Sequence, residues 1–518
     1  MIGFRRILLV IAATAALATT AWAEMIIPVN EAGTGSWVFD QPAVAVNGTV
    51  IHVAYVGDNS AGAAGSPNTR LYFASINGGA DFTNKLLTRG QVLLTAPLAI
   101  DDALFTSARH PQIALRTSTE LVILFQAIPV GDSSYKLFRA ILTIGNNVVT
   151  SQRVDEIRDA AGARIPGNLT DPSFNIVTID NTLRVSFASF PSLVAGSPYS
   201  DVYYARVGQD NARVANNAIL LTNTTGTTGV TPLPRLRIDS NNFSHIAWAA
   251  NNNDPTRTTP AGIYYAMVHA VAPSVVDNLA IGATQVLLGG YRWGFPCVLA
   301  SGSTIWILAA DEPFGPTGLA GSVGITQINP YNVVHDGNPV NVNNVGANAS
   351  FFPNPPGGTV LPASLDVYQP EAAVDSQGRL NVTGYGFRSA DGHGTPGKYY
   401  VTSFGSSAPG TSVSPVSVGI GDIAFATQLP GDYTRPAFVH FTGKAVQFWS
   451  GPDDVVTDAR NLYVTSVLGP ADPTTQSGCA TVDDPRRGEE GRIPGAAVLL
   501  LPAALLALRR AGRKAFAR

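Results

Sequence analysis

A proline followed by a short apolar strand pattern recurs along most of this chain. The repeated prolines stand 61 to 74 residues apart, at Pro42, Pro111, Pro172, Pro234, Pro296, Pro370 and Pro436. The clearest copy runs from Gln369 to Tyr385, where two stretches of alternating apolar residues flank the turn Asp375–Gly378. Such stretches joined by a short Asp/Ser/Gly turn predict an antiparallel β-hairpin. Internal repeats of this length indicate a fold assembled from copies of one unit.

The copies share further features after the proline. Tight turns follow the first strand, as at Asn47-Gly48 and Asp180-Asn181, which tolerate positive φ. The second strand carries an aromatic residue in each copy: Tyr55, Phe125, Phe187, Trp248, Trp306, Tyr385 and Trp449. A third strand contains pairs such as Tyr399-Tyr400, although the fifth copy offers only Gly324-Ile325 there. A fourth, outer strand is visible in several copies, at 91–95, 218–222 and 285–288.

Four antiparallel strands repeated every ~60–70 residues are typical of propeller blades. We therefore predict an all-β fold, a seven-bladed β-propeller of four-stranded antiparallel blades over residues 24–468. Closing the ring removes the sheet edges that an open stack would expose. The last copy lacks an outer strand before Pro470, and we expect the N-terminal segment Met25–Val29 to supply it.

The composition agrees with many short strands joined by loops. Only 13% of the 518 residues are charged, 45% are hydrophobic, and the chain holds 51 Gly and 36 Pro. The net charge is -3 and the body of the chain has no basic block, which argues against a nucleic-acid partner.

The N-terminus reads as a secretory signal peptide over residues 1–23. Arg5-Arg6 precede an apolar run from Ile7 to Leu17, and Ala21-Trp22-Ala23 forms a small-x-small cleavage site ending at Ala23. The mature chain would begin near Glu24, outside the cytoplasm.

The C-terminus carries a second predicted targeting signal. Residues 469–492 form a linker that contains Gly478-Cys479, and residues 493–518 form a short apolar helix with a basic cluster. The apolar stretch is shorter than the ~20 residues of a comfortable membrane-spanning helix, and Pro502 interrupts it. This order resembles the bacterial MYXO-CTERM and GlyGly-CTERM sorting tags. That resemblance implies a sorting protease, transient membrane anchorage and a final place at the cell surface, in the outer envelope or outside the cell. A plain membrane anchor is the alternative.

The body of the chain resembles the sialidase-like and BNR-repeat propellers. Their Asp-box motif has a degenerate counterpart at Ser75–Phe82, with Asn77 and Phe82 in place of Asp and Trp. The resemblance implies the propeller fold and a possible glycoside hydrolase activity. Sialidase-like enzymes place an arginine before a proline at the start of a blade, and only Arg435-Pro436 matches that pattern. The family's catalytic residues therefore do not carry over.

Topology nevertheless predicts where a ligand would bind. In a propeller, the first strand starts on the face from which the loop between the second and third strands emerges, and binding residues concentrate in such loops. Residues in these loops or just before the repeated prolines are our ligand-binding candidates: Asp311, Glu312, Asp391, His393, Arg435, His110 and Asp171. Gln41 and Gln369 occupy further positions before a proline.

The sequence contains no strong metal or catalytic motif. A Ca²⁺ site is conceivable at Asp453, Asp454 and Asp458, although Asp residues in loops commonly cap turns. His52, His245 and His440 lie in or beside strands, which predicts structural roles. Cys297 lies in an apolar strand pattern as a small buried residue, whereas Cys479 belongs to the tail.

These patterns favour a secreted or surface-displayed bacterial propeller that binds an extracellular glycan, peptide or envelope component. The alternative is a sialidase-like glycoside hydrolase with a nonstandard active site. The two differ in one observable, because a hydrolase needs two carboxyl groups ~5–10 Å apart in its site. A purely structural role is a third hypothesis that the sequence leaves open.

Overall fold

We describe the protein from a computed structural model. The structure describes residues 27–28, 38–58, 69–78, 98–100, 104–177, 180–190, 193, 200–215, 219–221, 233–250, 262–268, 284–287, 292–301, 304–312, 323–328, 349–350, 365–374, 380–388, 398–404, 418–420, 436–441, 444–452 and 460–467. The chain divides into two compact units, Met1–Val482 and Asp483–Arg518, and the second lies outside these ranges. Within them the secondary structure is β and no α-helix occurs.

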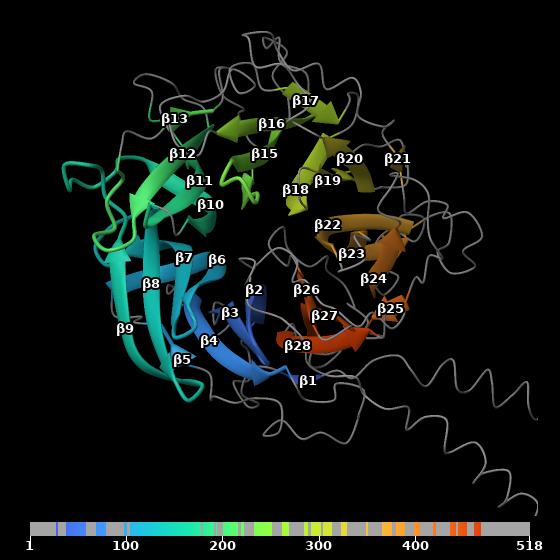
Figure 1. Cartoon of the computed structure of the whole chain (residues 1–518), viewed down its shortest axis with the longest axis horizontal. Coiled ribbons are helices and arrows are strands. Elements are labelled where there is room, and N and C mark those ends of the chain that lie inside the picture. Colours follow the sequence, from blue (N-terminus) through green and yellow to red (C-terminus); the bar gives the residue numbers. More distant parts are fainter. Residues whose placement is uncertain are drawn as a thin grey trace, which may run out of the picture. The chain divides into compact units, whose positions relative to one another are not determined.

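Five four-stranded antiparallel sheets follow one another along the chain, and their strands run side by side (Figure 1). The first contains β6 (Phe105–Thr117), β7 (Glu120–Pro129), β8 (Lys136–Gly145) and β9 (Val148–Glu156). The second contains β10 (Asn168–Val177), β11 (Thr182–Phe190), β12 (Asp201–Gly208) and β13 (Ile219–Leu220). The third contains β14 (Arg235–Ile238), β15 (Ser244–Ala250), β16 (Gly262–Val268) and β17 (Thr284–Leu287).

The fourth sheet contains β18 (Arg292–Ser301), β19 (Thr304–Glu312), β20 (Val323–Ile328) and β21 (Ala349–Ser350). The fifth contains β22 (Leu365–Val374), β23 (Leu380–Arg388), β24 (Lys398–Phe404) and β25 (Val418–Ile420), and β22 with β23 confirms the hairpin predicted at 369–385. Each sheet keeps the strand order of the chain, as a meander does.

An eight-stranded sheet joins the two ends of this series. Its strands are β26 (Ala437–Phe441), β27 (Lys444–Pro452), β28 (Arg460–Val467), β2 (Val38–Asn47), β3 (Val50–Asp58), β4 (Thr69–Asn77), β5 (Leu98–Ala99) and β1 (Ile27–Pro28). In the described part of the chain, β2–β5 are joined to the group formed by β26–β28 and β1 through a single strand pair, the parallel pairing of Val38 with Arg460. The predicted outer strand at 91–95 lies outside the described residues, and β4 pairs with β5.

The N-terminal segment completes the last group of strands. β1 pairs antiparallel with β28, with Ile27 opposite Val464 and Pro28 opposite Tyr463. This pairing confirms the prediction that the segment at Met25–Val29 supplies the missing outer strand. Ser450 Oγ adds a 2.7 Å hydrogen bond to Phe39 O, so the two ends of the series are also joined through a side chain.

The first strands of successive groups contact one another in order. β2 contacts β6, β6 contacts β10, and the series continues through β14, β18, β22 and β26 back to β2. Such a closed cycle of meander sheets is the contact pattern of a β-propeller. The cycle accounts for the nearly continuous apolar strand sequences, because each sheet lies between two neighbours. In β3, Tyr55 belongs to a core cluster with Val439 and Phe448, while Ala54 belongs to another with Phe125.

In five copies the repeated proline lies inside the first strand, so there the prediction that it opens the strand is wrong. β14 and β26 begin directly after Pro234 and Pro436, as predicted. β2 begins at Val38 and β6 at Phe105, several residues before Pro42 and Pro111. The antiparallel register shifts around the proline in five strands: β2, β6, β10, β18 and β22. Proline has no N–H to donate to a ladder, and a β-bulge is the place where a strand tolerates that loss.

The aromatic residues of the second strands stack across to the third strands. Stacked pairs are Tyr55–Tyr72, Phe125–Phe138, Phe187–Tyr203, Trp248–Tyr264 and Trp449–Tyr463, with ring centroids 4.8 to 6.3 Å apart. The fifth copy departs from the pattern, because Trp306 lies opposite Gln327. Cross-strand aromatic pairs stabilise a sheet, and here each one also fills the space between two sheets.

Candidate functional site

In the first four copies the residue before the repeated proline has an uncommon backbone conformation, and in three of them it lies at a β-bulge. Gln41, His110 and Asp171 each have a φ of 52°, and Leu233 has a φ of 47°. Positive φ is uncommon for residues other than glycine and costs on the order of 1–3 kcal/mol unless the surroundings hold it. The repeat therefore presents these side chains in a fixed direction that a regular strand would not give.

Two of these residues meet across a sheet boundary. His110 Nδ1 of β6 lies 2.7 Å from Asp171 Oδ1 of β10. Gln126 of β7 lies beside both, since its Oε1 is 3.1 Å from His110 Nδ1 and accepts a 2.6 Å hydrogen bond from Asp171 N. We call His110, Asp171 and Gln126 the junction. Gln41 connects the junction to β2, because Gln41 Oε1 accepts a 2.7 Å hydrogen bond from His110 N.

The junction is largely buried. The Asp171 side chain is 1% exposed and the His110 side chain 12%. The cause is the early start of the strands: the residue before the proline lies within β6 and β10, and the adjoining sheet covers it. A carboxylate at this depth needs a partner, and the imidazole supplies one.

The arrangement has a definite chemical capability. His110 Nδ1 lies between the Asp171 carboxylate and Gln126 Oε1, and these two acceptors fix the orientation of the imidazole ring. The junction can therefore hold a polar group in a defined direction. Among the residues that the structure describes, no group of three or more His, Cys, Asp or Glu side chains could hold a metal ion.

Sequence reasoning missed Gln126. Its signal is a buried polar residue inside the apolar run Leu121–Ile128, directly after the aromatic residue Phe125. Ser450 occupies the corresponding place after Trp449 and also bonds to the following strands. A polar residue after the second-strand aromatic residue thus joins neighbouring groups of strands in both cases.

The face on which the first strands start carries exposed apolar side chains. Leu104, Val130 and Phe190 are 44%, 63% and 51% exposed, and they stand before β6, after β7 and at the end of β11. Val130 N donates a 3.1 Å hydrogen bond to Leu104 O, so these two are neighbours. We call this surface the loop face.

Charged side chains occupy the same face. Arg164 Nε lies 2.7 Å from Glu156 Oε1, and Arg164 Nη1 lies 3.1 Å from Asp132 Oδ2. The pKa of the Arg164 guanidinium is raised, chiefly by its hydrogen bond with Glu156. The loop face thus combines exposed apolar groups with oriented polar ones.

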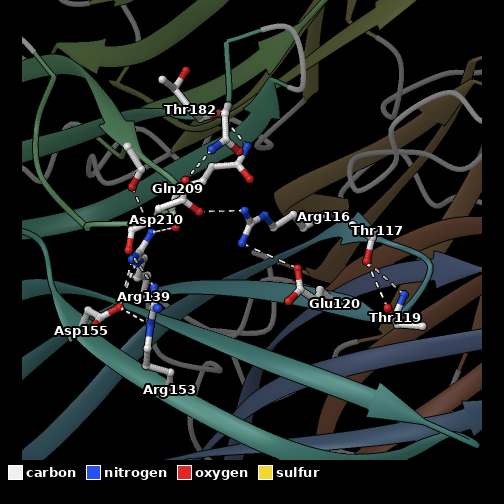
Figure 2. A network of polar contacts seen from close by, with 12 residues as sticks. Arg116, Thr117, Thr119, Glu120, Arg139, Arg153, Asp155, Thr182, Gln209 and Asp210 are labelled. Atoms are coloured by element: carbon white, nitrogen blue, oxygen red, sulfur yellow. Dashed lines mark hydrogen bonds and ion pairs between the residues drawn. The ribbon is translucent and has the colours of Figure 1, made fainter.

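On the opposite face, a polar network joins side chains of two neighbouring sheets (Figure 2). Arg139 is buried and donates to Asp155 Oδ2, to Gly208 O at 3.0 Å and to Gln209 O. Arg116 lies near the end of β6, and its Nη2 is 3.0 Å from Asp210 Oδ1. Burial lowers the pKa of Arg139, which Asp155 partly offsets. The network joins two sheets, and its acids and bases bond to one another.

The predicted structural roles of two histidines are confirmed. His52 is buried, its Nδ1 lies 2.9 Å from Ser75 Oγ, and burial lowers its pKa to about 4. His245 is buried between Tyr265 OH at 2.6 Å and Asp239 Oδ2 at 3.1 Å. Burial raises the pKa of Tyr265 well above its ordinary value. The side chain of His440 is outside the described residues.

Cys297 is buried, as predicted, and it also makes a polar contact with a neighbouring sheet. Its Sγ lies 3.6 Å from Glu371 Oε2, and each residue follows a repeated proline in its own sheet. The thiol is a weak donor to a buried carboxylate, so this position again links two neighbouring sheets.

Of the predicted ligand-binding residues, the structure brings together His110 and Asp171. Asp311 and Glu312 end β19, opposite Trp293 and Arg292 of β18. The remaining predicted positions lie outside the described residues: Asp391, His393, Arg435, Asp453, Asp454, Asp458, Ala23, Gly478 and Cys479. The same holds for the C-terminal segment 493–518, and in the described part of the chain no helix has the length and apolar character to cross a membrane.

Comparison with known proteins gives only distant likenesses. No protein-family model and no curated protein matches the chain. A protein of unknown function from Dyadobacter fermentans aligns at 11% identity with a TM-score of 0.43, covering 86% of this chain and 98% of its own. A thermostable family-43 glycoside hydrolase aligns at 12% identity with a TM-score of 0.33, covering 60% and 94%. An α-L-arabinofuranosidase from Podospora anserina aligns at 11% identity with a TM-score of 0.34, covering 60% and 98%.

Proposed function

We propose that this protein is an exported seven-bladed β-propeller that binds an extracellular glycan on its loop face. In this proposal the eight-stranded sheet counts as two blades, because a single parallel residue pair joins its halves. The signal peptide would direct export, and the C-terminal tag would hold the protein at the cell surface or release it there.

The observation that carries the proposal is the contrast between the two faces. The loop face combines the exposed side chains of Leu104, Val130 and Phe190 with the oriented charges of Arg164. On the opposite face of the same sheets, Arg116 pairs with Asp210 and Arg139 pairs with Asp155. A sugar ring has an apolar side that stacks on an aromatic residue and hydroxyl groups that bond to polar side chains. Phe190, with Asn168 opposite it on β10, offers both.

The remaining candidates extend the proposed site. The loops after the second strands contain Asp391, His393 and the possible Ca²⁺ ligands Asp453, Asp454 and Asp458, and they emerge on the loop face if the repeat is regular. A peptide or envelope component could use the same surface, and such ligands are outcomes of the binding experiment.

The junction favours binding over catalysis. A glycoside hydrolase commonly uses two carboxyl groups that reach the substrate. Asp171 is 1% exposed and is engaged by His110, so it serves the rigidity of the scaffold. The hydrolase alternative is tested on the same sample.

The experiment is a glycan-array and calorimetric binding measurement on the exported protein, with and without Ca²⁺. The variant Phe190→Ala should lose at least tenfold in affinity for the glycan that binds. Val148→Ala is the matched control, because Val148 is equally exposed, at 54%, but begins β9 on the opposite face. Equal loss in both variants, or no glycan binding, would contradict the proposal. Release of reducing sugar from sialosides, arabinans or fructans would favour the hydrolase.

Localisation has its own test. Deleting the tail from Ser477 onward should move the protein from the envelope fraction to the medium or the periplasm. An unchanged distribution after this deletion would mean that the tail is not a sorting signal.

A further inference from the structure

The boundary between the second and third sheets contains a buried polar layer at positions that are more apolar elsewhere. In β11, Arg184 and Ser186 stand shortly before the aromatic residue Phe187, and both are fully buried. The second strands of other copies carry apolar side chains at one or both of the matching positions: Val122 and Leu124, Val446 and Phe448, His52 and Ala54, His245 and Ala247. The two histidines in this list bond to Ser75 and Asp239 of their own copies.

Strand pairing sets the direction of the side chains in this layer. Arg184 lies opposite Arg206 of β12, and Ser186 lies opposite Tyr204. Side chains that lie opposite each other project from the same face of a sheet. This face meets the third sheet, because Tyr204 OH lies 3.3 Å from Ser244 Oγ of β15. Arg184, Ser186 and Arg206 therefore project together toward the third sheet.

The layer holds more positive than negative charge. Arg184 Nη2 lies 2.6 Å and Arg206 Nη2 lies 2.5 Å from the same atom, Asp180 Oδ2. The Arg184 side chain is 0% exposed, and those of Arg206 and Asp180 are 18% and 23% exposed. Thr182 Oγ1 donates to the other carboxylate oxygen, Oδ1, at 2.6 Å. One carboxylate thus serves two guanidinium groups, and one positive charge is in excess.

The other buried acids in the described parts of these two sheets do not offset that charge. Asp171 and Asp239 are engaged by histidines, and Asp201 begins β12, at the end away from Arg206. Tyr204 contributes no negative charge at neutral pH, because burial raises the pKa of its hydroxyl group. Removing one partner of a buried ion pair is strongly destabilising, which shows the cost of an uncompensated buried charge.

Two hydrogen-bond donors in this layer have no hydrogen-bond partner among the residues that the structure describes. They are Ser186 Oγ and Arg206 Nε, and the Ser186 side chain is 0% exposed. Buried polar groups in folded proteins nearly always have a partner. A monatomic anion accepts hydrogen bonds from any direction and also supplies the missing negative charge. A water molecule would supply the acceptor alone.

We propose that the boundary between the second and third sheets binds one chloride ion. Ser186 Oγ and Arg206 Nε donate to the ion, and the guanidinium of Arg184 is the neighbouring positive charge. The ion balances the charge of the layer and thereby stabilises the contact of β11 and β12 with the third sheet. This site does not depend on the proposed glycan binding.

Titration of the full chain with chloride tests the site. Replacing sodium gluconate by sodium chloride at constant ionic strength should raise the melting temperature by ~2 °C or more, because an ion that binds only the folded state stabilises it. The constant ionic strength keeps the screening of surface charges equal. The chloride NMR line should broaden with the folded protein and narrow when bromide competes. Equal stability in the two salts, or a line that stays narrow, overturns the proposal.

Variants separate this site from chloride bound elsewhere. Ser186→Ala removes one donor without changing the charge and should weaken chloride binding roughly tenfold, as the loss of a hydrogen bond to an ion does. Ser189→Ala is the matched control, because Ser189 is equally buried in β11 but lies opposite Leu169, on the face toward the first sheet. It should keep the chloride dependence of the parent chain.

The variant Arg206→Gln tests the charge. It leaves Arg184 and Asp180 as a neutral pair and should abolish the chloride dependence of the melting temperature. If Ser186→Ala fails to fold by near-UV circular dichroism, the comparison of Arg206→Gln with Ser189→Ala decides. A chloride response that Arg206→Gln keeps overturns the proposal, and so does a response that Ser189→Ala loses as well.

Discussion

His110 Nδ1 and Asp171 Oδ1 lie 2.7 Å apart across the boundary between two sheets. Each residue precedes a repeated proline and has a φ of 52°. The same bulge in two successive copies therefore aims a base and an acid at each other. Neither residue meets the other through its own sheet, so the pair is a contact of tertiary structure.

Breaking this pair should destabilise the protein more than the loss of a surface ion pair would. Asp171→Ala leaves the imidazole without its buried partner and should lower the free energy of unfolding by about 3 kcal/mol. His110→Ala should cost a similar amount. Urea denaturation of both single variants and the double variant measures the coupling, which should exceed ~1 kcal/mol. Strictly additive effects would mean that the ion pair contributes nothing beyond packing.

Stability should fall as His52 becomes protonated. Burial lowers its pKa from the ordinary value of 6.5 to about 4 in the folded protein. The unfolded chain thus binds more protons than the folded one between these two pH values, and stability is lost as the pH falls through this window. The loss should approach about 3 kcal/mol, because one pKa unit corresponds to ~1.4 kcal/mol.

The variant His52→Gln removes this titration. The difference in unfolding free energy between the parent and the variant should change between pH 6.5 and pH 4 and be constant above pH 7. Chemical denaturation at several pH values measures it. A difference that is independent of pH would show that His52 does not titrate in this range.

Gly78 should resist substitution because of a contact between the two ends of the chain. A Cβ at Gly78 would lie 2.6 Å from Phe441 Cζ and 3.1 Å from Ile51 Cγ1. Phe441 is buried in the core cluster that joins β2–β4 to β26–β28. Gly78→Ala should therefore cost about 1–3 kcal/mol, as overpacking does.

Gly48 is the control for Gly78. It has a φ of +58° and no atom within 4 Å of its would-be Cβ, and asparagine tolerates this conformation. Gly48→Asn should change the melting temperature little, whereas Gly78→Ala should lower it clearly. Similar melting temperatures for the two variants would contradict the contact with Phe441.

Removing β1 should expose the edge of β28. A chain that begins at Ser36 lacks Ile27 and Pro28, which pair with Val464 and Tyr463. It should be about 1–3 kcal/mol less stable than a chain that begins at Glu24 and should aggregate faster, because an unpaired edge recruits other strands. Thermal unfolding and light scattering measure both effects.

A deletion of Asp483–Arg518, the second compact unit, serves as the control for β1. It removes more residues but should leave the unfolding transition of the propeller unchanged. If both deletions destabilise the protein equally, the effect does not come from the pairing of β1 with β28.

The order of strands could be predicted because each copy repeats a local pattern. Alternating apolar residues and turn residues such as Asn47-Gly48 depend only on neighbours in the sequence. The bulge was not foreseen, because a proline is compatible both with the start of a strand and with a bulge inside it. Only the partner strand distinguishes the two, and β7 continues well past Phe125 to pair with Arg109 and Ala108.

In the candidate site, too, some residues could be predicted from the local sequence and others could not. His110 and Asp171 were identifiable as residues before a proline, but Gln126 was hidden inside an apolar strand. Arg139 and Asp155 likewise lie on two strands of one sheet, and the further partners of Arg139 are Gly208, which ends β12 of the next sheet, and Gln209, which follows it. Such contacts depend on how two sheets face each other, which no local pattern specifies.

The sequence by itself determined the repeat, the all-β class and the aromatic position in each second strand, because backbone periodicity and turn chemistry are local. It also indicated that the N-terminus closes the series, because the last copy was one strand short. The tertiary structure alone decided that five of the prolines lie at bulges within strands and that His110 and Asp171 meet as a largely buried pair across two sheets. The physical reason is that burial depends on the neighbouring sheet, and that sheet comes from another part of the chain.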